Sequence, residues 1–162
     1  MIRILQLCHI IPINDIKRYV ARRTGRKEND MFSDLHYSIA RELISCANKH
    51  ELIAYKDLCE KINYGGVRKI GVYLDPISKF TYFHYGIFIS SIVILKGTKK
   101  NGQGFIKMYR SVTGDYATPE SDIEEAQREK VYEQDWSILI KEMQYSERDS
   151  MPPPKRNPSV TS

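Results

Sequence analysis

The chain has 162 residues, of which 41% are hydrophobic, so it can bury the core of one ordinary domain with short extensions. No apolar run reaches the roughly 20 residues of a membrane-spanning helix, and the N-terminus lacks the small-residue cleavage site of a secretion signal. Three cysteines without a CxxC pair argue against a disulfide framework and a zinc knuckle. We therefore expect a cytoplasmic protein that does not contact a membrane.

Charge is divided unevenly along the chain. Residues 1–110 carry 19 Lys and Arg against 9 Asp and Glu, a net of +10, whereas residues 111–150 carry 4 against 11, a net of −7. A basic body is typical of a protein that binds a polyanion. An ordinary surface with uneven charge explains the same numbers, so the pattern needs support from motifs.

The N-terminal residues 1–32 are predicted to form a basic arm. Asn14 is expected to cap a short helix, and the polar side of this helix carries Arg18, Arg22 and Arg23. These three arginines are expected to make a second contact with a polyanion.

The next predicted element is an amphipathic helix over residues 34–48. Apolar residues recur every four positions from Leu35 to Ala47, which is the spacing of a core-facing stripe. Ser33 is expected to cap this helix, and His36 is expected to lie on its surface.

A helix-turn-helix pattern follows. Residues 51–54 favour a brief strand and residues 55–62 a short helix. The turn NYGG at residues 63–66 contains two glycines, which permit positive φ at low cost. The period of residues 67–74 predicts a second helix with an apolar face.

A helix break is expected at Asp75-Pro76. This pair is typical of a helix start, and a proline disfavours helical geometry in the residue before it. A separate helix is therefore predicted over residues 76–85, ending at Gly86.

The following segment predicts a β-hairpin. Residues 87–95 are rich in β-branched side chains, which favours a buried strand, and residues 105–110 are expected to form a second strand. The loop between them contains NGQG at residues 101–104, interpreted as a hairpin turn because no helix is expected after it, as a phosphate-binding loop requires. Helices followed by a hairpin predict an α+β fold with a winged helix-turn-helix domain over residues 33–112.

The remaining residues form an acidic segment and a tail. Thr118-Pro119 is expected to cap a helical region over residues 120–146, with a restart near Asp135, and Trp136 is expected to anchor it in a core. We interpret residues 113–148 as an acidic helical segment that covers the basic face as a DNA mimic, or that binds a partner protein or a second copy through residues 115–148. The Pro-rich residues 149–162 are expected to be disordered.

These predictions define a candidate DNA interface. Gly65 and Gly66 would let a helix N-terminus approach a phosphate. The side chains expected in or near a DNA groove are those of Arg68, Lys69 and Tyr73. The side chains expected to contact phosphates from the hairpin are those of Lys96, Lys99, Lys100 and Lys107. Such contacts give affinity and salt dependence, not sequence choice. The alternative is a small α+β domain with solvated lysines.

The stretch LIAYKDLCEKINYGGVRKIGVYLDPI resembles the C-terminal winged-helix domain of methylated-DNA–protein cysteine alkyltransferases and alkyltransferase-like proteins. In that family a tyrosine opens the first helix of the helix-turn-helix, and the recognition helix carries R-A-V-G. Here Tyr55 follows Ala54, where a Ser or Thr is usual, and Arg68-Lys69-Ile70-Gly71 matches the second motif. The resemblance implies that Arg68 enters the base stack when a nucleotide is flipped and that Tyr55 packs beside the displaced phosphate.

The sequence departs from the family at the reactive cysteine that accepts the alkyl group. The reactive cysteine of the family lies in a P-C-H-R motif shortly after the recognition helix, but the stretch FTYFHYGIFISSIVIL in this chain contains no cysteine. The resemblance therefore supports DNA engagement and not alkyl transfer.

Other chemistry is weakly indicated. Cys8 and His9 are neighbours that would point to opposite faces of a strand, and the four histidines lack metal-ligand spacing. A solvated helix face is preferred to a metal-nuclease cluster for the acidic residues Asp122, Glu124, Glu125 and Glu129. No catalytic residue, metal or cofactor is expected.

The leading expectation is a non-enzymatic DNA-binding protein, such as the recognition subunit or regulator of a bacterial or phage defence-related nucleoprotein assembly. A protein-interaction adaptor or inhibitor acting through the acidic helices is the first alternative. A nuclease or DNA-modifying enzyme is the second.

Overall fold

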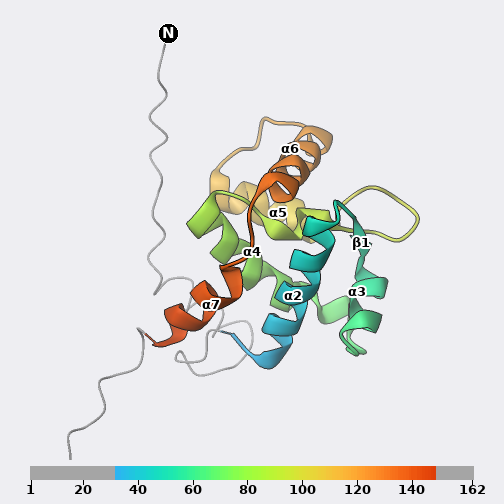
Figure 1. Ribbon diagram of the computed structural model, residues 1–162. Coiled ribbons are helices and arrows are strands. Elements are labelled where there is room, and N and C mark those ends of the chain that lie inside the picture. Colours follow the sequence, from blue (N-terminus) through green and yellow to red (C-terminus); the bar gives the residue numbers. More distant parts are fainter. Residues whose placement is uncertain (1–31, 149–162) are drawn as a thin grey trace, which may run out of the picture.

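The structure, a computed structural model, describes residues 32–148. The arginines of the predicted N-terminal arm and the predicted tail lie outside the described residues. Residues 32–148 form a mainly helical α+β fold in which a single small sheet pairs two strands of two residues each (Figure 1). The α+β class is confirmed, but several elements differ from the sequence predictions.

Helix α2 spans Asp34–Asn48 and follows Ser33, as predicted. The surface position expected for His36 is wrong, because its side chain is fully buried. The Ser33 backbone N–H donates to His36 Nδ1 at 2.9 Å, which turns the ring back toward the start of the helix. There the ring packs edge-on against Tyr73, with centroids 5.0 Å apart.

Strand β1 (Ile53–Ala54) leads directly into helix α3 (Tyr55–Lys61), and both agree with the predicted short strand and short helix. Strand β1 pairs in parallel with strand β2 (Val93–Ile94), with Ile53 opposite Val93. This pairing places the beginning of α3 beside the chain that follows β2.

The predicted helix break at Asp75-Pro76 is wrong. A short 3-10 helix, η1 (Val67–Lys69), precedes helix α4, which runs without interruption over Gly71–Tyr85 and contains Pro76. A proline inside a helix removes one hydrogen bond and costs about 3 kcal/mol or more. The helix continues because Leu74, Ile77 and Phe80, at helical spacing across the proline, are all buried in one core.

The long strand predicted over residues 87–95 is also wrong. This segment contains the 3-10 helix η2 (Ile89–Ile92) and only the two residues of β2. Before β2, several backbone N–H groups donate to side chains and not to a neighbouring strand. Phe88 N–H donates to Gln127 Oε1 at 3.0 Å and Ser90 N–H to Ser78 Oγ at 2.9 Å, so these residues are buried outside the sheet.

The second hairpin strand, predicted over residues 105–110, is a helix. Helix α5 spans Gln103–Thr113 and ends at Gly114, which has a φ of +74°. Phe105, Ile106 and Met108 are buried in a second apolar cluster together with Phe88 and Ile123. The hairpin of a winged helix is therefore not formed by these residues, and loop 95–100 connects β2 to the segment before α5.

Helices α6 (Glu120–Glu133) and α7 (Leu139–Arg148) account for the predicted C-terminal helical region and its restart. Trp136 is 1% exposed, as expected of a core anchor, and its indole N–H donates to the Val131 carbonyl at 2.8 Å. Val131 and Trp136 belong to the same core cluster as the buried residues of α2 and α4. The acidic segment therefore shares one core with α2, α3 and α4.

The contact between α4 and α7 gives a first test of this shared core. The Tyr85 hydroxyl donates to the carboxylate of Glu142. Replacing Tyr85 with Phe keeps the ring but removes the donor, so the free energy of unfolding should fall by about 1 kcal/mol. Urea unfolding measures this change. Tyr116→Phe is the control, because Tyr116 is 70% exposed, and equal effects of the two substitutions would contradict the contact.

Candidate nucleic-acid interface

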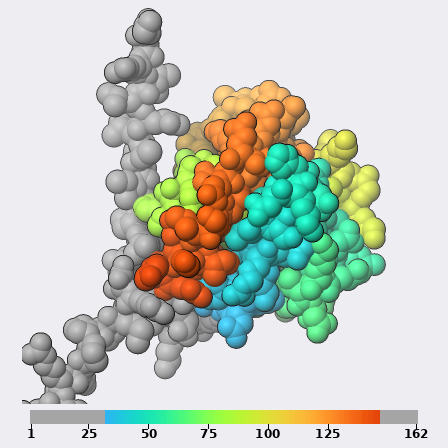
Figure 2. All heavy atoms as spheres, in the orientation of Figure 1, coloured from blue at the N-terminus to red at the C-terminus, as the bar shows by residue number. Residues whose placement is uncertain are grey.

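The pairing of β1 with β2 brings loop 95–100 against the first turn of α3. Lys96 Nζ lies 3.8 Å from Asp57 Oδ1, and a Cβ atom on Gly102 would lie 3.1 Å from the Tyr55 hydroxyl. All six residues of the loop are exposed. Figure 2 shows the loop, in yellow, next to the green α3 on one side of the molecule.

Tyr55 is the first residue of α3 and is only partly exposed. Burial raises the pKa of its phenol above the ordinary value, a hydrogen bond from the Gly102 backbone acts in the opposite direction, and the charge of Asp75 raises the pKa further. The hydroxyl therefore stays protonated at neutral pH and remains able to donate a hydrogen bond.

The segment η1 carries two exposed basic side chains next to the turn. Arg68 and Lys69 are exposed, and Val67 beside them is 40% exposed. Neither Arg68 nor Lys69 forms an ion pair with another residue in the range 32–148. Because η1 packs against both α3 and α4, these two cations are carried on an ordered turn, not on the helix predicted for residues 67–74.

Tyr73 is not part of the free surface. It is partly buried, and its ring packs edge-on against His36 and against Tyr64, with centroids 5.0 and 5.7 Å apart. Tyr73 thus joins α2 to α4 and the turn, and the structure does not present it with Arg68 and Lys69 as a groove-facing side chain.

The two glycines of the turn have a different role from the predicted one. The positive φ lies at Asn63, with a value of 54°, and at neither glycine. A Cβ atom on Gly66 would come within 2.5 Å of the Tyr64 ring, so Gly66 allows a close approach of that ring. Gly65 is exposed and has open space around it.

Loop 95–100 is closed on itself by local hydrogen bonds. Leu95 N–H donates to the Lys100 carbonyl at 2.9 Å, and Thr98 N–H donates to the Leu95 carbonyl at 3.1 Å. Gly97 takes a φ of +76°, in the left-handed region that favours glycine. The loop therefore has a defined shape, and neither Lys99 nor Lys100 forms an ion pair with any described residue.

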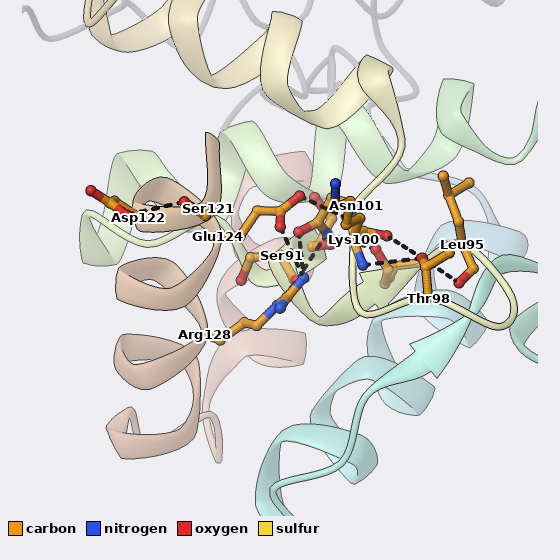
Figure 3. A network of polar contacts seen from close by, with 11 residues as sticks. Ser91, Leu95, Thr98, Lys100, Asn101, Ser121, Asp122, Glu124 and Arg128 are labelled. Carbon is orange, nitrogen blue, oxygen red and sulfur yellow. Dashed lines mark hydrogen bonds and ion pairs between the residues drawn. The ribbon is translucent and has the colours of Figure 1, made fainter. Parts of the chain in front are cut away.

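A buried polar network holds the end of this loop, and the sequence analysis did not find it (Figure 3). The side-chain amide of Asn101 donates to the carbonyls of Ser91 and Val93 at 2.9 and 2.6 Å. Its oxygen accepts from Arg128 Nη2 at 2.8 Å, and its backbone N–H donates to Glu124 Oε1, also at 2.8 Å. Asn101 is 4% exposed. Glu124 and Arg128 of α6 therefore bind the base of the loop from the interior of the fold.

One further prediction, the hairpin turn at residues 101–104, is wrong. The sequence NGQG at 101–104 was expected to be a hairpin turn because no helix was expected to follow it, yet α5 begins at Gln103. Gly102 precedes that helix without a side-chain cap. Lys107, predicted on a hairpin strand, is an exposed residue of α5.

The acidic residues of α6 separate into an inner and an outer group. Glu124 is 7% exposed and faces the network, whereas Glu125 and Glu129 are exposed. Within residues 32–148, no group of three His, Cys, Asp or Glu side chains is arranged to hold a metal ion. Over the same range, no helix has the length and apolar content needed to cross a membrane.

Comparison with known proteins returned no match to this chain among protein-family models, curated proteins or solved structures.

Proposed function

We propose that this protein binds double-stranded DNA, without catalysis, through a basic surface composed of Arg68, Lys69, Lys99 and Lys100 together with Tyr55. The observation that carries the proposal is the exposure of four unpaired cations on two ordered segments, η1 and loop 95–100, that both contact α3. Unpaired cations on ordered backbone can displace the counterions of DNA phosphates without first giving up an acidic partner.

The two segments have different parts in this proposal. The turn η1 and the start of α4 enter a groove, in the manner of a helix-turn-helix, with Arg68 and the exposed Val67 leading. Loop 95–100 takes the place that a wing has in winged-helix proteins and contacts phosphates through Lys99 and Lys100. A protein of this kind suits the recognition subunit or regulator of a nucleoprotein assembly.

A fluorescence titration of a short labelled duplex at several salt concentrations tests the proposal. We expect log K to fall linearly with log salt, with a slope of about −4, because all four cations, the groove-facing Arg68 included, displace counterions from the duplex. Arg68→Ala should weaken binding and reduce the slope by about 1. Arg41→Ala is the matched control, because Arg41 is exposed on α2. No binding at low salt, or equal effects of the two substitutions, would overturn the proposal.

A second candidate function is binding of a protein partner, or of a second copy of this chain, at the outer face of α6. The observation in its favour is that this face is crowded with exposed carboxylates, those of Asp122, Glu125, Glu129 and Glu133. Sedimentation of the full chain tests self-association. A dimer that dissociates in Glu125→Lys/Glu129→Lys would support the second-copy form, and a monomer at all concentrations would remove it.

A further inference from the structure

We infer that Glu124 and Arg128 of α6 act through Asn101 as positioning residues, which hold loop 95–100 in the shape that presents Lys99 and Lys100 to DNA phosphates. The inference rests on the proposed function and adds to it the parts of the fold that set the geometry of the loop. It also gives the acidic segment a role different from covering the basic surface.

The distances show where the two buried charges direct their hydrogen bonds. Arg128 Nη2 lies 3.8 Å from Glu124 Oε2, which is beyond a hydrogen bond, although the two side chains are one helical turn apart and only 15% and 10% exposed. Each side chain is closer to Asn101, at 2.8 Å, and Arg128 Nε also donates to the Ser91 carbonyl at 3.0 Å. Both charged groups therefore direct hydrogen bonds to the base of the loop, while the ion pair between them is too long for a hydrogen bond.

Burying two charged side chains costs free energy and is favoured only where the charges hold part of the fold in place. A buried ion pair frequently contributes no net stability compared with apolar side chains of similar volume, and breaking one partner leaves an uncompensated charge. The element fixed here is the junction between η2, β2 and loop 95–100, because Asn101 bonds backbone carbonyls on both η2 and β2. The polar network thus connects η2, β2 and loop 95–100 to α6.

The loop depends on this anchor because its own contacts are few. Its hydrogen bonds join residues within the loop, between Leu95, Thr98 and Lys100, and its six residues are exposed. Internal bonds fix the shape of the loop but not its direction relative to α3, and the ion pair that joins Lys96 to Asp57 of α3 is solvent-exposed and therefore weak. Without the anchor, DNA binding would have to order the loop and two lysine side chains at once, which weakens affinity.

Asn101→Ala in the full chain tests the inference, because it removes the side-chain bonds to Ser91, Val93 and Arg128. We expect faster amide exchange and larger backbone motion over residues 96–100 by NMR, with the amides of α2 and α4 still protected. Duplex affinity at fixed salt should fall about tenfold. In the Asn101→Ala background, Lys99→Ala/Lys100→Ala should have much less effect than in the unsubstituted protein, because loosely held lysines contribute less.

Arg128→Lys is the second variant, because it keeps the charge but loses the fork that reaches Ser91 and Asn101 together. It replaces Asn101→Ala if that variant does not fold, and the same changes are expected. Lys130→Ala is its control, since Lys130 is exposed on the same helix.

The outcomes separate the inference from the proposed function. Unchanged order in loop 95–100, or additive effects of the asparagine and lysine substitutions, would overturn the inference even if the protein binds DNA. A loosened loop with unchanged DNA affinity would overturn it as well. Failure of the unsubstituted protein to bind DNA would overturn the proposed function, and with it the DNA-presenting role, while NMR of the loop, which needs no DNA, would still decide whether the network holds it.

Discussion

Replacing Arg68, Lys69, Lys99 and Lys100 together with alanine should lower the affinity for a short duplex by about a hundredfold or more at low salt. Each of these side chains is exposed and lacks an ion-pair partner among residues 32–148, so each can release counterions from a phosphate. The salt slope should become correspondingly shallow. Titration of the labelled duplex at several salt concentrations measures both quantities.

The control must remove the same amount of charge from another part of the surface. Four exposed cations on α2, directly after α2, on α6 and on α7 meet this condition, and they are Arg41, Lys49, Lys130 and Lys141. Their replacement with alanine changes the net charge equally but leaves η1 and loop 95–100 intact. If both quadruple variants lose affinity to the same extent, DNA responds only to net charge and the basic surface is not a site.

Replacing Trp136 with alanine should lower the free energy of unfolding by about 3–5 kcal/mol. The side chain is 1% exposed, packs in the core that also contains residues of α2 and α4, and donates a hydrogen bond to the Val131 carbonyl. Truncation removes this burial and leaves both a cavity and a carbonyl without its donor. Urea unfolding of the full chain measures the change.

Ile138→Ala is the matched control for Trp136, because Ile138 lies two residues away and is 50% exposed. It should change the free energy of unfolding by less than about 1 kcal/mol. A small effect at Trp136 would mean that α6 and α7 are not needed by the core. A large effect would mean that the core needs α6 and α7, so the interpretation that the acidic segment covers the basic face has to be tested by substitution on the outer face of α6.

Part of the fold follows from local sequence. Helices α2 and α3 were predicted nearly to their ends, because the apolar stripe, the Ser33 position and the turn after Lys61 act over a few residues. The start of α6 after Thr118-Pro119 and the burial of Trp136 were predicted for the same reason. Of the candidate site, the exposure of Arg68, Lys69, Lys99 and Lys100 was also predictable, since charged side chains without a partner stay in water.

The helix over residues 103–113 could have been found from the sequence. Phe105, Tyr109 and Val112 recur at helical spacing, and Gly114 is a typical residue at a helix end. Because a winged helix was expected, a second strand was preferred for these residues in spite of their helical spacing. The β-branched stretch at 87–95 contains no signal that would have argued against a strand, because a buried irregular segment and a buried strand have the same apolar composition.

The sequence by itself determined which segments are amphipathic helices and which cations remain exposed, because both depend on neighbours a few residues away. Only the tertiary structure decided that α4 passes through Pro76, that His36 turns inward and that residues 87–101 contain a strand of only two residues. These outcomes depend on partners far along the chain, such as Gln127, Glu124 and Arg128, whose side chains satisfy the backbone where no strand does. The pairing of β1 with β2, which also joins residues far apart in the chain, brings loop 95–100 to the first turn of α3.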